Sequence, residues 1–212
     1  MLKIYDAKMN DIGVEDKKIV HQRGLWHKVF GGVLYNSKLK TVYFQTIYPK
    51  ESYTFEREDY IDFAVGGHIE DNESVEEAGI REIREELGFD IDKNDWSFLG
   101  IRVCNADPSE SYKIREFQYF YALKIDKELK DLDFSKSDGE VKSIIEVDID
   151  EYLSLLTKEA NEVKANEMLL DRDTRKGKYL SDIKLTQNRI VPDYFNDKSI
   201  LEKFLAVKSL MR

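Results

Sequence analysis

Apolar positions along the chain predict two groups of strands with one helix between them. Each strand segment is rich in β-branched and aromatic residues, whereas the helix repeats apolar residues at i, i+3 and i+4. The six strand segments are 26–36, 41–49, 60–69, 97–105, 115–125 and 141–149. Strands on both sides of one central helix favour an α+β fold, an α/β/α sandwich with a mixed sheet, over a repeating βαβ unit.

The last third of the chain changes character. Residues 150–170 keep apolar positions at helical spacings, and residues 199–211 do the same. We therefore predict one domain over residues 1–155 and a C-terminal helical extension over residues 156–212, packed on that domain. The extension is either a cap that shapes substrate access or an arm of a homodimer, and the pattern does not separate the two.

The central helix carries its own start and stop signals. Ser74 and Glu77 match a capping box, so the helix is predicted to begin at Val75, and Gly88 can end it in the left-handed conformation. Glu82 and Glu86 share a face that differs from the apolar stripe, and Glu85 borders it. Several carboxylates therefore converge on one edge of the helix.

Two of these carboxylates lie where a helix disfavours negative charge. Glu85 and Glu86 occupy the last turn, where the macrodipole makes each unfavourable by about 0.3–1 kcal/mol. A solvated charged face is the usual explanation of an acidic helix. A bound Mg²⁺ or Mn²⁺ would reverse the sign of the repulsion, since both ions prefer oxygen ligands. The pattern favours a metal site.

Composition and charge limit the binding partners and the cellular compartment that we expect for this protein. A net charge of −9 and a pI of about 5.0 argue against a nucleic-acid or anionic-membrane surface. The single Cys104 excludes an internal disulfide and is typical of a cytosolic thiol. The chain has no apolar run near the ~20 residues that a membrane helix needs, and residues 1–13 lack the regions of a signal peptide. We expect a cytoplasmic protein.

Residues 67–89 resemble the signature of the Nudix hydrolase superfamily, GX5EX7REUXEEXGU, where U is a bulky apolar residue. The matching residues are Gly67, Glu73, Arg81, Glu82, Ile83, Glu85, Glu86, Gly88 and Phe89. An accidental match of the seven fixed identities has a probability on the order of one in 10⁵ per sequence. The resemblance implies a Nudix-type sandwich, a small-molecule diphosphate substrate and hydrolysis that depends on Mg²⁺, with Mn²⁺ as the alternative ion.

The same resemblance assigns roles within the signature. It makes Glu82, Glu85, Glu86 and the backbone of Gly67 the metal ligands. Glu73 and Arg81 are similar to the pair that braces the loop to the helix, and Gly67 and Gly88 belong to the same structural motif.

Hydrolysis also needs a group that takes the proton of the attacking water. Family members carry this base on the signature helix, here Glu82 or Glu85, or on a later loop, where Glu140 is the candidate and an ordinary loop acid is the alternative. Glu116 is a further candidate metal ligand. Phe117, Tyr119 and Tyr121 alternate along the same strand, a pattern more typical of a core than of a nucleobase platform.

A second resemblance covers residues 1–36. The run RGLWHKVFGGVLYN at 23–36 is similar to the N-terminal segment of Nudix proteins related to isopentenyl diphosphate isomerase. His27 and His68 occupy positions where the isomerase has histidines, so both are candidate contacts to a metal or a phosphate, although a structural histidine is the commoner case. Gly66 stands where the isomerase has a cysteine, and His21 has no assigned role.

Three interpretations follow, of which Gly66 disfavours isomerisation and the intact set of carboxylates argues against a sensor. The leading one is a Mg²⁺-dependent diphosphatase that cleaves a nucleoside diphosphate linked to another moiety. The alternatives are an isoprenoid diphosphate isomerase and a nucleotide sensor without turnover. Because Nudix proteins commonly dimerise, we also expect a homodimer.

Overall fold

The computed structural model describes residues 1–49 and 60–212. Within them, nine strands form one mixed sheet with the order β11-β10-β9-β4-β3-β8-β7, and the short β5 and β6 pair with β4 and β3. The strands are β3 (His27–Asn36), β4 (Thr41–Ile47), β5 (Asp62–Phe63), β6 (Val65–His68), β7 (Trp96–Ser109), β8 (Tyr112–Lys124), β9 (Val141–Asp148), β10 (Glu162–Leu170) and β11 (Gly177–Thr186). β3 and β8 run parallel, whereas the other paired strands are antiparallel.

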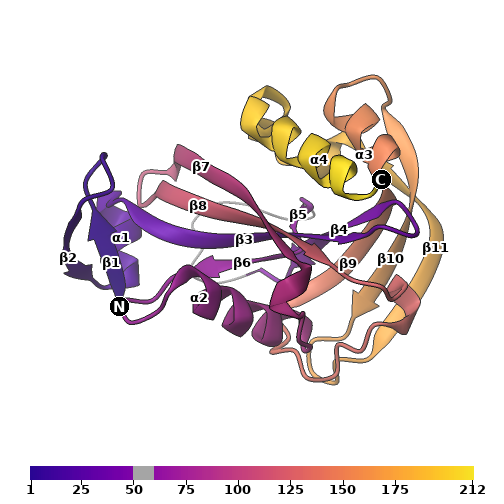
Figure 1. The fold of residues 1–212 in the computed structure, drawn as a ribbon, viewed down its shortest axis with the longest axis horizontal. Helices are drawn as coiled ribbons and strands as arrows, with labels where there is room; N and C mark the ends of the chain where they lie inside the picture. Colours follow the sequence, from indigo (N-terminus) through magenta and orange to yellow (C-terminus); the bar gives the residue numbers. More distant parts are fainter. Residues whose placement is uncertain (50–59) are drawn as a thin grey trace.

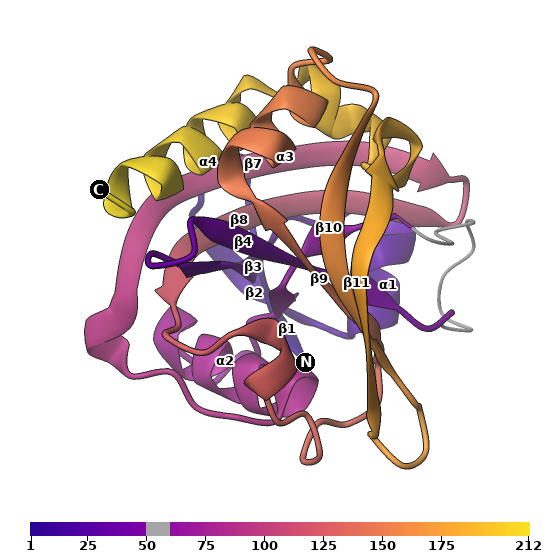
Figure 2. The same ribbon diagram turned by 90° about the vertical axis from the view of Figure 1, so that its right-hand side faces the viewer.

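Helices cover both faces of the sheet, as Figures 1 and 2 show. On one face lie α2 (Val75–Glu82) and the π-helical turn that continues it (Ile83–Leu87), whose Ile83 and Leu87 belong to one apolar core with Phe30. On the other face lie α3 (Ile149–Leu156) and α4 (Lys198–Leu210), whose Tyr152 and Phe204 belong to a second core. The chain therefore has the predicted mixed α+β fold.

The N-terminal residues form a smaller unit at one end of the sheet (Figure 1). It consists of β1 (Leu2–Tyr5) and β2 (Asp11–Glu15), which pair with each other, and α1 (Lys17–Arg23). The 3-10 turns are Lys93–Asp95, Leu129–Asp131, Gln187–Arg189 and Pro192–Asn196. No helix among the described residues is long and apolar enough to cross a membrane.

The predicted helix over 150–170 is wrong in its second half. α3 ends at Leu156, and residues 162–170 form β10 between β9 and β11. The residue types there favour a helix, but Val163 and Ala165 are buried on alternate positions, and pairing on both edges outweighs local propensity. The predicted helical extension over 156–212 therefore supplies two sheet strands before α4.

Candidate functional site

The signature helix begins and ends as its sequence predicts. The Ser74 hydroxyl accepts from the Glu77 amide, and the Glu77 carboxylate accepts from the Ser74 amide, which completes a capping box at Ser74, directly before the helix begins at Val75. At the other end Gly88 has φ 78°, and its amide donates to the Arg84 carbonyl. These two caps fix which carboxylates face the sheet.

Two carboxylates of this helix lie directly against the backbone of β6. A Cβ atom on Gly67 would come within 1.9 Å of Glu82 Oε1, so only glycine leaves room for that carboxylate. Glu86, only 6% exposed, accepts from the Gly66 amide at 2.9 Å and from Gln45 Nε2 at 3.4 Å. The third, Glu85, has a side chain that is 47% exposed.

Arg81 connects the loop after β6 to the carboxylates of the helix. Its guanidinium donates to both oxygens of Glu73, at 2.7 and 2.9 Å, and to the His68 carbonyl at 3.0 Å. A further nitrogen donates to Glu82 at 2.7 Å and to Glu85 at 3.1 Å. A planar guanidinium can hold such a bidentate pair, whereas an ammonium cannot. Glu73 and Arg81 thus form an ion pair that joins the loop to the helix.

Glu82 is a carboxylate whose environment shifts its pKa upward. Burial raises its pKa to about 7, although the adjacent Arg81 acts in the opposite direction, and Glu85 adds to the increase. A buried carboxylate that ionises near neutral pH is typical of a ligand or a base at a functional site. A bound divalent cation would favour its ionised form.

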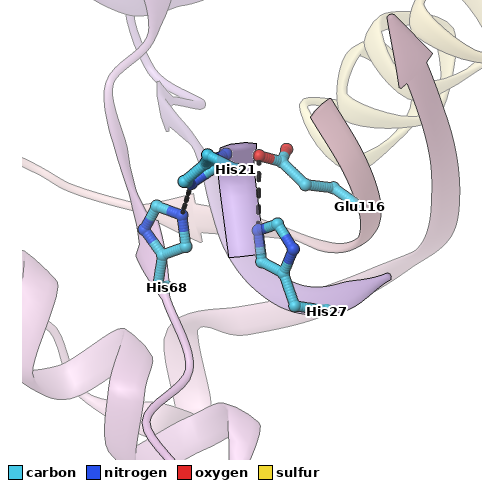
Figure 3. Close-up of side chains that lie close together, drawn as sticks. All are labelled: His21, His27, His68 and Glu116. Atoms are coloured by element: carbon cyan, nitrogen blue, oxygen red, sulfur yellow. Dashed lines mark hydrogen bonds and ion pairs between the residues drawn. The ribbon is translucent and has the colours of Figure 1, made fainter. Parts of the chain in front are cut away.

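A second group of side chains, which we call the histidine–glutamate cluster, contains His21, His27, His68 and Glu116 (Figure 3). One ligand atom from each residue lies within 4.8 Å of the corresponding atoms of the others. His27 and Glu116 are partners in the register of the parallel β3–β8 pair, His68 ends β6, and His21 comes from α1. Imidazole nitrogens and one carboxylate form a donor set suited to a divalent transition metal.

The hydrogen bonds of the cluster point its Nε2 atoms inward. His21 Nδ1 lies 3.2 Å from the Lys113 carbonyl and His27 Nδ1 lies 2.9 Å from the Leu25 carbonyl, so each Nδ1 carries the proton and each Nε2 is free to accept. His27 is 1% exposed, and its Nε2 has no hydrogen-bond partner among the described residues. Burial is the main cause that lowers the pKa of His21, which favours the neutral, ligating imidazole. An orphaned buried nitrogen in this donor set fits a cation.

Comparison with known proteins gives the family of this chain. The NUDIX domain family matches residues 25–168. This chain belongs to the Nudix family. It is similar to the "Uncharacterized Nudix hydrolase CA_C0446" of Clostridium acetobutylicum, with 28% identity over 206 residues and 96% of each chain covered. The crystal structure of DR0079 from Deinococcus radiodurans has a similar fold, with a TM-score of 0.51, 19% identity, and coverage of 74% of this chain and 88% of that one.

Glu82, Glu85 and Glu86 of this Nudix protein line one cavity of about 380 Å³ together with His68 and Glu116 of the histidine–glutamate cluster. Its lining includes the predicted site residues Gly67, His68, Glu82, Glu85, Glu86, Glu116 and Glu140. Glu140 reaches it from the loop before β9, where the Glu140 carbonyl accepts from the Tyr48 amide. The structure thus brings together residues that are up to 73 positions apart, from Gly67 to Glu140.

Other residues considered in the sequence lie apart from this cavity. Phe117 is buried and stacks on Trp26 at 4.9 Å, and the Tyr121 hydroxyl donates to Glu76 on α2, so both have packing roles. Tyr119 and Tyr121 are absent from the cavity lining. Burial raises the pKa of Cys104, which lies on β7 opposite Glu116.

One member of the histidine–glutamate cluster, His21, was not predicted as a ligand from the sequence. His21 lies on α1, which we did not predict, and its Nε2 is 2.9 Å from His68 Nε2. Asp16 at the N-cap and Gly24 at the C-cap mark this helix in the sequence. These cap signals predict a helix but no ligand, because tertiary packing alone brings α1 beside β6 and β8.

Proposed function

We propose that this Nudix protein is a divalent-cation-dependent diphosphatase that cleaves a nucleoside diphosphate linked to another moiety. The observation that carries the proposal is the position of Glu82 and Glu86 against the backbone of β6, at a cavity that these two carboxylates line together with Glu85 and Glu140. The carboxylates of this cavity repel the negative charge of a diphosphate unless bound cations neutralise the carboxylates and the diphosphate together.

Two sets of residues would hold these cations. Glu82, Glu85, Glu86 and the backbone of Gly67 provide hard oxygen ligands that suit Mg²⁺, with Mn²⁺ as an alternative. The histidine–glutamate cluster provides a softer set that suits Mn²⁺, Co²⁺ or Zn²⁺. Bound cations supply neutralisation of the phosphoryl oxygens and a water that ionises near neutral pH.

The protein's own residues orient this chemistry. Arg81 fixes the position of Glu82, and the amide of Gly66 fixes that of Glu86. We propose that Glu85 or Glu140 takes the proton of the attacking water, because both carboxylates line the cavity beside the ligand set. The water oxygen bonds to one phosphorus as the bond from that phosphorus to the bridging anhydride oxygen breaks, so the products are a nucleoside monophosphate and the phosphorylated moiety.

The first experiment is turnover of a panel of nucleoside diphosphate derivatives and isoprenoid diphosphates with Mg²⁺, Mn²⁺ or EDTA. The proposal expects cation-dependent hydrolysis of one class and a loss of more than about 100-fold in Glu86→Gln, since ligand loss exceeds the usual 10–100-fold effect of an outer-shell change. Glu151→Gln, an exposed carboxylate on α3, is the control. Glu85→Gln and Glu140→Gln then identify the base. An unchanged rate in Glu86→Gln refutes the site.

The histidine–glutamate cluster favours a second candidate, an isoprenoid diphosphate isomerase, because the resemblance of residues 1–36 implies histidine ligands there. Gly66 in place of the isomerase cysteine argues against it. Conversion of an isoprenoid diphosphate to its double-bond isomer without phosphate release would establish this candidate. Tight binding of one nucleotide with no turnover of any compound would instead indicate a sensor.

A further inference from the structure

We propose that Gln118 and Arg102 are positioning residues that connect the N-terminus of α4 to the histidine–glutamate cluster and orient Glu116 within it. This inference rests on the part of the proposed function that places a cation in the cluster. Neither residue belongs to the Nudix signature, and neither provides a ligand atom of the cluster.

A continuous series of hydrogen bonds forms the connection. Asp197 Oδ2 accepts from Arg102 Nε at 2.6 Å, and Arg102 Nη1 donates to Gln118 Oε1 at 2.7 Å. Gln118 Nε2 then donates to Glu116 Oε2 at 2.7 Å. The other oxygen, Glu116 Oε1, lies 3.7 Å from His27 Nε2. The β7–β8 register places Arg102 opposite Gln118, so the sheet itself brings these side chains together.

The direction of each bond follows from the chemistry of its donor. A guanidinium has N–H donors and no acceptor, so Arg102 determines that the Gln118 carbonyl oxygen faces it. The Gln118 amide nitrogen must then face Glu116 and donate to it. This bond occupies one carboxylate oxygen, favours the ionised form of Glu116 and leaves the second oxygen beside the histidines.

Asp197 fixes the far end of the connection. Its Oδ1 accepts from the Ser199 amide at 2.9 Å as the N-cap of α4, while Oδ2 is bound to Arg102. Arg102 is only 8% exposed, and its guanidinium lies 5.6 Å from the centre of the Tyr194 ring. The C-terminal segment thus has a role at the cation site besides packing on the sheet.

Binding of Co²⁺ to the full chain tests the inference, because its visible absorption reports ligand geometry directly. His27→Asn should remove the absorption and so assign it to the cluster. Gln118→Met keeps the length of the side chain but cannot donate, and we expect it to weaken Co²⁺ binding about 10–100-fold and to alter the spectrum. Gln118→Asn, an amide too short to reach both partners, is the second variant if Gln118→Met does not fold.

A matched pair of cap variants separates positioning from helix stability. Asparagine caps helices as well as aspartate does, so Asp197→Asn keeps the cap of α4 but weakens the bond to Arg102. Asp148→Asn makes the same change at the N-cap of α3, away from the cluster. We expect Asp197→Asn, and not Asp148→Asn, to weaken Co²⁺ binding several-fold. In the Gln118→Met background, Asp197→Asn should add no further loss.

Each outcome bears on a different step. Wild-type affinity and an unchanged spectrum in Gln118→Met overturn the inference while the proposed cation centre stands. If Asp197→Asn weakens Co²⁺ binding equally in the wild-type and Gln118→Met proteins, Asp197 does not act through Gln118. That result overturns the connection to α4. Wild-type protein without a histidine-dependent Co²⁺ spectrum removes the cation centre itself, and with it the inference. Hydrolysis, measured separately, reports on the diphosphatase proposal.

Discussion

Replacing Glu82 with glutamine should make the cation-free protein more stable at alkaline pH. Burial raises the pKa of Glu82 from its ordinary 4.5 to about 7, so the folded state holds this proton more tightly than the unfolded state. Stability therefore falls as pH rises from about 4.5 to about 7 and stays lower above that range. Glutamine has nearly the same shape and does not ionise, so the variant avoids this loss.

The magnitude follows from the same two pKa values. Their difference corresponds to roughly 3 kcal/mol of unfavourable free energy when Glu82 is fully ionised, since one pKa unit is worth about 1.4 kcal/mol. Between about pH 5.5 and about pH 8.5, the stability of Glu82→Gln relative to wild type should therefore increase by roughly 2 kcal/mol.

Urea unfolding of both proteins in EDTA at the two pH values measures this change. Glu151→Gln, an exposed acid on α3, should show no such pH dependence. Adding Mg²⁺ should stabilise wild type more than Glu82→Gln, because only the ionised carboxylate is a strong ligand. A stability difference between Glu82→Gln and wild type that is the same at both pH values would refute the argument that burial dominates the pKa of Glu82.

Three further predictions concern Gly67 beside Glu82, the Arg81 guanidinium that holds Glu73, and Phe204 in the core under α3 and α4. Gly67→Ala should abolish Mg²⁺-dependent turnover, because the added Cβ would displace Glu82. Gly66→Ala should retain more activity, because its Cβ would meet its nearest atom, the Phe30 carbonyl oxygen, at 3.3 Å. Curves of turnover against Mg²⁺ concentration compare the two variants. Arg81→Lys should lose the bidentate contact and about 1–3 kcal/mol of stability in urea unfolding, and unaltered stability would contradict the stabilising role of this ion pair. Phe204→Ala should lose about 3–5 kcal/mol in the same assay because its ring is fully buried, and a loss below about 1 kcal/mol would contradict that burial.

Local signals predicted the signature helix well. The capping box at Ser74 and the left-handed Gly88 depend only on neighbours along the chain, so the helix begins and ends close to the expected residues. Five of the six predicted strands match β3, β4, β7, β8 and β9, whereas the strand predicted over 60–69 is divided into β5 and β6, and β1, β2, β10 and β11 were not predicted. Because Glu82, Glu85 and Glu86 lie on this one short helix, the signature alone predicted that their side chains lie near one another.

Features that depend on distant contacts were not predictable in the same way. Residues 162–170 contain good helix formers, yet pairing with β9 and β11 makes them a strand. His21 has no local mark of a ligand, and its position depends on how α1 packs against β8. The connection from Asp197 to Gln118 joins three elements through side chains, so no spacing along the chain reveals it.

The short strand β6 explains why the signature and the histidines form one site. Gly66 donates its amide to Glu86, Gly67 leaves room for Glu82, and the ring of His68 belongs to the histidine–glutamate cluster. Three consecutive residues thus contact both proposed sets of ligands, and the register of β6 against β3 fixes their positions. A shift of one residue would turn His68 to the opposite face and move Gly67 from Glu82 at the same time. We therefore expect a variant that shifts the register of β6 to impair cation binding at both proposed sets of ligands.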